Sequence, residues 1–209
     1  MNIKERKIIF VAGLHGNEQM PVKALKENNI PFVLGNPRAL KKSARFIDCD
    51  LNSSFGLRNK SYEVRRTKEI LKEIKKNDLT VDFHTTTATT PPFVIITDKK
   101  MVSLAARTGL ARVVLMKHNI KQSRALIDYR DGISIEMGGH KSRKNYKLTL
   151  QIVKNILSCK KYPVKLFEVY GKITEPGRYY KFKKYSGGFI PVLAGEKAYN
   201  FYGLKARKV

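Results

Sequence analysis

Short apolar runs rich in β-branched residues alternate with longer segments of helical spacing over about the first 157 residues of this 209-residue chain. The strand-like runs are Lys7–Val11, Phe32–Leu34, Thr80–His84, Phe93–Thr97, Val113–Met116 and Ile133–Glu136. The helix-like segments are Gln19–Asn28, Tyr62–Lys76 and Lys147–Leu157. Because alternating strands and helices form layered structures with parallel crossovers, we expect an α/β fold with a mixed, partly parallel sheet and flanking helices.

The C-terminal segment has a different character. From about Lys160 onward the chain loses helical periodicity, and glycine, proline and aromatic residues interrupt it. This pattern predicts short antiparallel strands, either as an appended β-domain or as an extension of the first part. We therefore divide the chain into an α/β domain over residues 1–158 and a small β-rich C-terminal domain over residues 159–209.

The charge of the chain raises the question of a polyanionic partner. There are 42 lysine and arginine residues against 17 aspartate and glutamate residues, which gives a formal net charge of +25. Such a charge attracts nucleic acid. The best site for it combines Lys181, Lys183 and Lys184 with Tyr179, Tyr180, Phe182 and Tyr185. A solvated antiparallel face has the same alternating pattern, so nucleic acid is the less favoured partner.

Composition also bears on the compartment. No apolar run approaches the roughly 18 to 20 residues that a membrane helix needs. The first residues run straight into a strand-like segment and lack the features of a signal peptide. Two cysteines, Cys49 and Cys159, are too few for a disulfide framework. We expect a cytoplasmic protein with no membrane partner.

Two separate segments contain residues that can bind a metal ion. His15 and Glu18 follow the first strand-like run in VAGLHGNE, and an imidazole and a carboxylate at this spacing are competent zinc ligands. His84 ends another strand-like run, where open α/β sheets bind ligands, and Asp82 is placed to orient its imidazole. A surface pair and a core histidine are the alternative interpretations. We expect His118 and His140 to be surface or loop residues.

Further candidates follow from a buried acid and a basic loop. Glu136 ends an apolar run and precedes two glycines, a position that suits a general base as well as a capping or ion-paired residue. In the segment from residue 36 to residue 55, Arg38 and Arg45 are candidates for binding anions, and Asn52 offers a neutral hydrogen bond. In a chain this basic, any single arginine is also compatible with a solvated surface.

Taken together and in this order, VAGLHGNE, NPRALKKSARFIDCDLN, DFHTTT and IEMGG closely resemble the succinylglutamate desuccinylase/aspartoacylase family of zinc carboxypeptidase-like hydrolases. The resemblance resumes at GEKAY, residues 195–199. It implies that one zinc ion is bound by His15, Glu18 and His84, and that Glu136 is the catalytic base. It also implies that Arg45 polarises the scissile carbonyl, that Asn52 grips a substrate carboxylate and that Tyr199 reaches in from the C-terminal part.

The chain departs from the family at one position. Ser53 stands where the family usually has an arginine that pairs with a substrate carboxylate, and Arg124 is the nearest fit to a further substrate-binding arginine of the family. The resemblance implies hydrolysis of the amide bond of a small acidic N-acyl amino acid or a related compound. A carboxypeptidase-like peptidase and a non-catalytic polyanion-binding protein are the alternatives.

Overall fold

The computed structural model describes residues 6–88, 90–116, 123–140, 142–197 and 200–209. The strands of these residues form one nine-stranded sheet in the order β2-β1-β3-β6-β4-β5-β7-β9-β8. The strands are β1 (Ile8–Ala12), β2 (Phe32–Leu34), β3 (Leu79–Thr86), β4 (Phe93–Ile96), β5 (Arg112–Leu115), β6 (Gly132–Gly139), β7 (Lys165–Ile173), β8 (Ile190–Val192) and β9 (Gly203–Lys208). The expected mixed α/β sheet is confirmed, with β4 and β6 as the antiparallel pair in its centre.

Helices cover both faces of this sheet. The α-helices are α1 (Gln19–Glu27), α2 (Pro37–Lys41), α3 (Tyr62–Glu73), α4 (Val102–Ala105), α5 (Leu126–Tyr129) and α6 (Lys144–Leu157). Short 3-10 helices are η2 (Leu51–Ser53), η3 (Lys99–Met101) and η4 (Ala106–Thr108). No helix within the described ranges is both long enough and apolar enough to cross a membrane.

Each face of the sheet has its own core. Alternate residues of β1 point to opposite faces, as strand geometry requires. Phe10 packs in a cluster that also contains residues of α1, α4 and α6. Val11 packs in a second cluster, where Ile70 of α3 and Leu126 of α5 cover the other face. The loops that carry the candidate site residues lie on the side covered by α3 and α5.

Helix α3 shows how local sequence positions an element. The Ser61 hydroxyl accepts a hydrogen bond from the Val64 N–H (3.3 Å), so a capping serine precedes the first turn. Val64 and Ile70 are fully buried and share one stripe, while lysine and arginine cover the other side. The helix ends at Glu73, three residues before the expected Lys76, because Ile74 has extended backbone angles.

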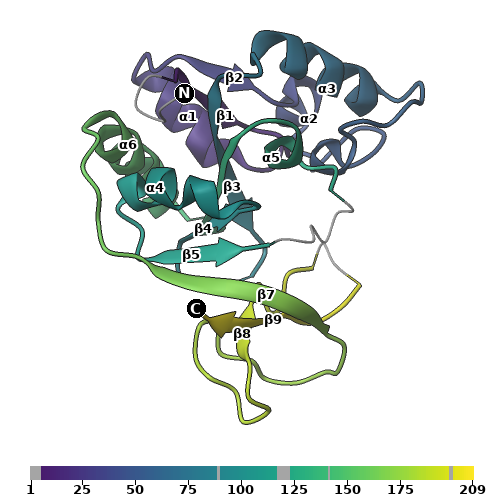
Figure 1. Cartoon of the computed structure of the whole chain (residues 1–209). Coiled ribbons are helices and arrows are strands. Elements are labelled where there is room, and N and C mark those ends of the chain that lie inside the picture. The colour runs from purple at the N-terminus through teal and green to yellow at the C-terminus, as the bar shows by residue number, and fades with distance from the viewer. Residues whose placement is uncertain (1–5, 89, 117–122, 141, 198–199) are drawn as a thin grey trace.

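The C-terminal part continues the same sheet (Figure 1). Strand β7 pairs in parallel with β5, and β9 and β8 follow in antiparallel fashion. The expected β-rich character is present, but the first of these strands is long and joins the α/β sheet directly. This pairing favours the extension over the separate unit, and the division at residue 158 stays a prediction.

Candidate functional site

His15 and Glu18 lie on the loop between β1 and α1. The Glu18 N–H donates a hydrogen bond to the His15 carbonyl (3.1 Å), and Nδ1 of His15 lies 3.1 Å from Oε1 of Glu18. Gly16 lets this loop pack closely on α2, because a Cβ there would lie 2.0 Å from the Ala39 carbonyl carbon. The glycine therefore allows the tight turn that brings the two side chains together.

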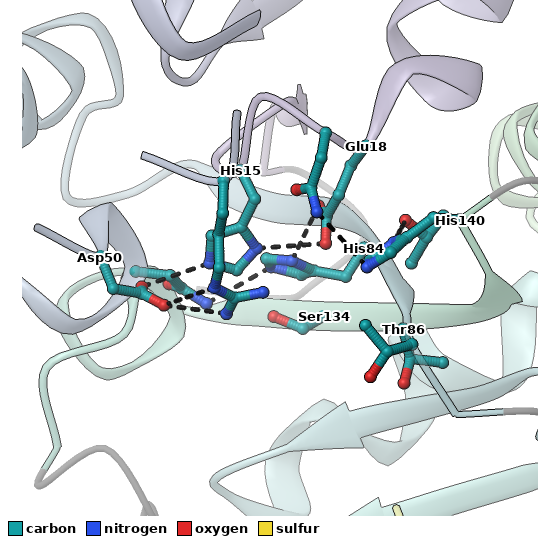
Figure 2. A network of polar contacts seen from close by, with 12 residues as sticks. His15, Glu18, Asp50, His84, Thr86, Ser134 and His140 are labelled. Carbon is teal, nitrogen blue, oxygen red and sulfur yellow. Dashed lines mark hydrogen bonds and ion pairs between the residues drawn. The ribbon is translucent and has the colours of Figure 1, made fainter. Parts of the chain in front are cut away.

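His84 reaches the same point from β3. Its Nδ1 atom lies 3.3 Å from Oε2 of Glu18, and the rings of His15 and His84 are 5.3 Å apart between centroids. The three side chains are buried, and each offers one ligand atom within 4.8 Å of the others. Figure 2 shows them pointing toward one another. Two imidazole nitrogens and one carboxylate oxygen are a donor set typical of zinc sites that keep a position for water.

In each of the two histidines, the ring nitrogen that does not face Glu18 contacts an aspartate. Nε2 of His15 lies 3.2 Å from Oδ1 of Asp50, and Nε2 of His84 lies 2.5 Å from Oδ2 of Asp82. Because both Nε2 atoms are engaged, the Nδ1 atoms are the ones that face Glu18. Carboxylates behind metal-binding histidines fix the orientation of the ring and raise its basicity. The expected contact between Asp82 and His84 is present.

The electrostatics of this cluster favour a cation. Burial alone raises the pKa of Glu18, but His15 and His84 outweigh it and hold the pKa well below the usual value of a carboxyl group. Burial alone lowers the pKa of His84, but Asp82 and Glu18 outweigh it and raise the pKa well above the usual value. A positive charge between these carboxylates is therefore stabilised, and a divalent metal ion fits this donor set.

Glu136 lies beside the cluster because of strand register. Strands β3 and β6 are parallel neighbours in which His84 pairs with Glu136 and Asp82 pairs with Ser134. Paired residues of adjacent strands point to the same face, and the Ser134 hydroxyl donates a hydrogen bond to Asp82 Oδ2 (3.4 Å). The sheet therefore places the predicted base and the predicted ligand on one surface.

Arg45 comes from the loop after α2. Its Nε and Nη2 atoms donate to Oδ2 of Asp50 at 3.2 and 2.8 Å, while the other oxygen of Asp50 faces His15. Burial alone lowers the pKa of Arg45, but Asp50 outweighs it and raises the pKa, so the guanidinium stays charged. One aspartate thus fixes both a predicted catalytic cation and a predicted metal ligand.

A buried acid holds the loop that carries Arg45 and Asp50. The carboxylate of Glu63, which is fully buried on α3, accepts hydrogen bonds from the backbone N–H groups of Ile47 (2.7 Å) and Asp48 (3.1 Å). It also accepts one from the side-chain amide of Asn36 (3.0 Å). Charge-assisted bonds of this kind are stronger than neutral ones. The Glu63 carboxylate therefore stabilises the conformation of the loop that carries Arg45 and Asp50.

These side chains line one cavity. The lining includes the polar residues His15, Glu18, Arg45, Asn52, His84, Thr85, Thr86, Ser134, Glu136 and Glu196. Asn52 is buried, with its side-chain oxygen accepting a hydrogen bond from the Leu126 N–H (3.0 Å) and its Nδ2 atom 3.4 Å from Nε2 of His84. The structure therefore brings six predicted site residues together, although they are distributed over 122 positions of the chain.

The C-terminal part contributes Glu196 to this cavity. Its buried carboxylate accepts hydrogen bonds from the Thr86 hydroxyl, from the Thr87 N–H (3.0 Å) and from the Thr87 hydroxyl (2.7 Å). These bonds tie the segment after β8 to the end of β3. We did not single out Glu196 from the sequence, although its place in the GEKAY segment was a usable signal.

Two of the predicted substrate-binding residues do not line the cavity, and a third lies outside the described residues. Arg38 is exposed, with its guanidinium carbon 4.5 Å from the centre of the Tyr62 ring, because α2 turns this side chain outward. Arg124 is half-buried directly before Ala125, which lines the cavity, but Arg124 itself does not line it. Tyr199 lies outside the described residues. Their roles stay predictions.

His140, which we expected to be a surface or loop residue, lies in a turn and belongs to the polar network of this region. It is half-buried at the end of β6, where its Nδ1 atom lies 2.6 Å from the Thr85 hydroxyl. Its Nε2 atom lies 3.5 Å from Nδ2 of Asn17. Figure 2 places it at the end of the polar network opposite Asp50. Its proximity depends on strand pairing, which the local sequence does not reveal. His118 lies outside the described residues.

The basic and aromatic segment near residue 180 is only partly available to a polyanion. The ring of Phe182 lies 5.2 Å from the rings of both Phe93 and Phe167, so it packs into the core instead of facing solvent. Tyr180 is exposed, with Arg178 5.3 Å from its ring centre. At least one aromatic residue of this segment, Phe182, therefore serves to attach the loop to the core and is not part of a polyanion-binding surface.

Comparison with known proteins identifies the family. Residues 4–159 match the model of the succinylglutamate desuccinylase/aspartoacylase catalytic domain. The chain belongs to this family. The resemblance inferred from the four ordered motifs is therefore confirmed.

Named relatives in this family are moderately similar. A probable aspartoacylase of Prochlorococcus marinus subsp. pastoris is 32% identical over 158 residues, which are 64% of this chain and 53% of that protein. The aspartoacylase of Mus musculus is 30% identical over 218 residues, with 81% of this chain and 69% of that protein covered. The matched region spans between 35% and 53% of the length of the Prochlorococcus relatives.

Solved structures of the family share the fold. Murine aminoacylase 3 superimposes with a TM-score of 0.78 at 18% identity, covering 98% of this chain and 95% of that chain. Succinylglutamate desuccinylase from Vibrio cholerae superimposes with a TM-score of 0.71 at 15% identity, covering 98% and 82%. Both likenesses extend over the C-terminal strands as well as the region that the family model matches.

Proposed function

We propose that this protein is a zinc-dependent amidohydrolase that cleaves the amide bond of a small acidic N-acyl amino acid or a related compound. The observation that carries the proposal is the convergence of His15, Glu18 and His84 within 4.8 Å, in the cavity that also holds Glu136. Membership of a family whose relatives are named aspartoacylases supports an enzyme that hydrolyses amides. We place the reaction in the cytoplasm.

One zinc ion per chain would be held by Nδ1 of His15, Nδ1 of His84 and the carboxylate of Glu18. When bound, it would supply a Lewis acid and would lower the pKa of a coordinated water toward about 7. Asp50 and Asp82 orient the two imidazoles by their hydrogen bonds to Nε2. These carboxylates keep both rings in the tautomer that presents Nδ1 as the ligand atom.

Glu136 is the proton carrier of this scheme. Its carboxylate accepts a proton from the attacking water, and the same oxygen returns the proton to the nitrogen of the departing amine. Proton transfer by a positioned group typically contributes roughly 10²–10⁴-fold to a rate. The position of Glu136 beside His84 in the strand register supports this role.

Arg45 stabilises the carbonyl oxygen as negative charge develops on it. Its guanidinium is charged and lines the cavity, with Asp50 holding two of its nitrogens. Asn52 contributes a neutral hydrogen bond to the substrate, and Arg124 and Tyr199 are the candidates for its carboxylate. The peptidase alternative shares all of this chemistry and differs only in the substrate.

The test combines metal analysis with a substrate panel. Protein purified without a metal-binding tag should contain one zinc ion per chain, lose activity with a chelator and regain it with Zn²⁺. It should hydrolyse N-acyl amino acids faster than short peptides. The Glu136→Gln variant should keep its zinc and lose at least about 100-fold in turnover. A zinc-loaded Glu136→Gln protein as fast as the parent would refute the assignment, and a preference for peptides would favour the peptidase.

A further inference from the structure

The wall of the cavity changes chemical character from one strand to the next. On β3 and β6 the residues facing the cavity are polar, with His84 paired to Glu136 and Ser134 placed two positions earlier. Strand β4 continues this surface, because Ile95 is the antiparallel partner of Ser134 and points to the same side. The surface therefore turns apolar beside Ser134, two positions from the predicted catalytic base.

Three further apolar side chains extend this wall. Met116 follows β5 and is two positions beyond Val114, the partner of Ile95. Ile127 of α5 and Leu193 after β8 face the cavity from other elements, and both are buried. We refer to Ile95, Met116, Ile127 and Leu193 as the apolar wall.

The apolar wall is rigidly supported. Met116 and Leu193 belong to the hydrophobic cluster of β5, β7 and β9, and Ile95 packs against that cluster. The Thr97 hydroxyl donates a hydrogen bond to the Ile127 carbonyl (3.3 Å), which ties α5 to the end of β4. Closely packed surfaces of this kind resist rearrangement. The wall is therefore a preformed surface that a ligand must match.

The described residues that line the cavity offer little positive charge to an anionic group on this wall. Among the lining residues that the structure describes, Arg45 is the only lysine or arginine, and its guanidinium already binds Asp50. Glu18, Glu136 and Glu196 line the same cavity. A substrate carboxylate placed on the apolar wall would lose its hydration without gaining a counter-charge, which is costly.

We propose that the apolar wall selects N-acyl amino acids that carry one carboxylate and an aliphatic or aromatic group, either as side chain or as acyl chain. This inference rests on the proposed function and names its substrate class. N-acetylaspartate has two carboxylates and N-succinylglutamate has three, so each must place an additional anion in a cavity where Arg45 is the only lysine or arginine among the described lining residues. Ser53, in place of the arginine expected there, is consistent with a substrate of lower charge.

The first experiment measures kcat/KM of the zinc-loaded parent chain. The panel contains N-acetyl-L-leucine, N-acetyl-L-phenylalanine, N-hexanoylglycine, N-acetylglycine, N-acetyl-L-aspartate and N-succinyl-L-glutamate. We expect kcat/KM of the best apolar substrate to exceed that of both N-acetyl-L-aspartate and N-succinyl-L-glutamate by about 100-fold or more, the range reached when a pocket discriminates by apolar contact and unpaired charge. The leucine, phenylalanine and hexanoyl compounds distinguish a side-chain pocket from an acyl pocket. A preference for N-acetyl-L-aspartate or N-succinyl-L-glutamate would overturn the inference.

Variants of the wall provide the second test. Met116→Gln makes the wall polar with little change of volume, and Ile95→Thr makes it polar while replacing the ethyl arm of isoleucine by a hydroxyl. Each should lower kcat/KM for the best apolar substrate about 10-fold while leaving N-acetylglycine unaffected. Leu157→Gln, at an exposed leucine of α6, is the matched control. Melting temperature and zinc content identify a variant that has merely misfolded. Equal losses on all substrates with intact folding would overturn the inference.

Calorimetric binding to zinc-loaded Glu136→Gln separates the two proposals. Tighter binding of N-acetyl-L-leucine than of N-acetyl-L-aspartate, abolished by Met116→Gln, supports the apolar wall even if the parent protein hydrolyses nothing. In that case only the proposed hydrolase function fails. Binding of neither compound, together with no hydrolysis, would overturn both proposals.

Discussion

Oδ2 of Asp82 lies 2.5 Å from Nε2 of His84, and both residues are buried on the same face of β3. This contact leaves Nδ1 of His84 to face Glu18. The pair therefore couples the orientation of one imidazole to the geometry of the whole metal-binding cluster.

Replacing Asp82 should weaken metal binding more than it weakens folding. In Asp82→Asn, the carboxylate that orients His84 is lost, and partners of this kind typically contribute 10–100-fold in metal affinity. Competition with a zinc chelator of known affinity measures the loss. Asp98→Asn, which removes an exposed carboxylate, is the control for the change in net charge and should bind zinc like the parent. Unchanged zinc affinity in Asp82→Asn would contradict the orienting role.

Substitutions of Arg45 and of Asp50 should differ in their effects on zinc binding and turnover. Arg45→Lys removes the planar fork that lines the cavity, so we expect turnover to fall by about 10²–10³-fold while zinc affinity stays near that of the parent. Asp50→Asn should lower both, because Asp50 contacts Arg45 and His15 at once. Zinc competition and kcat on the best substrate are measured for both variants. Loss of zinc in Arg45→Lys would show that the arginine acts structurally.

Glu196 should stabilise the fold as well as the cavity. In Glu196→Ala, the buried hydroxyl of Thr86 loses its acceptor, which typically costs about 1–3 kcal/mol in the free energy of unfolding, and the exposed Thr87 loses two hydrogen bonds. Urea unfolding at neutral pH measures this cost, with Glu175→Gln at an exposed glutamate as the control. A free energy equal to that of the parent would mean that the C-terminal segment is held by other contacts.

Asp131 should make stability depend on pH in acid. Burial alone raises its pKa, but hydrogen bonds from Lys100 (2.9 Å) and Arg6 (2.7 Å) outweigh it and lower the pKa below the usual 3.8. A carboxyl group with a lowered folded-state pKa contributes stability that is present above its unfolded pKa and lost as the pH falls through the folded one.

The Asp131→Asn variant measures this contribution. At pH 7 it should be less stable than the parent by about 1 kcal/mol or less, because the pair is partly exposed and screened. The difference should shrink as the pH falls below 3.8 and should also shrink in high salt. Urea unfolding of both proteins at pH 7, 5 and 3 tests this. A difference that does not vary with pH would contradict the ion-pair explanation.

Much of the fold was predictable because its strands and helices have clear local periods. Strand β2 has the expected bounds, and the other expected strands and helices differ from the observed ones by a few residues at their ends. The joining of β7 to β5 was not predictable, since a long strand after residue 160 pairs with one about fifty residues earlier. Local sequence carries no record of such pairing.

The residues of the candidate site were also predictable only in part. Its ordered motifs named His15, Glu18, His84 and Glu136, because metal-binding and acid–base chemistry admit few residue types. His140 was missed, since its contact with Thr85 depends on β6 lying beside β3. Arg38 was expected to bind an anion, but α2 directs its guanidinium onto the Tyr62 ring.

The sequence by itself determined the family, the kind of sheet and the set of residues able to bind a metal ion. These properties follow from residue chemistry and from short-range periodicity, which each segment carries alone. Only the tertiary structure decided which nitrogen of each histidine faces Glu18 and which side chains complete the cavity wall. Those choices depend on strand register and on contacts between segments far apart in the chain, whose energies no local pattern records.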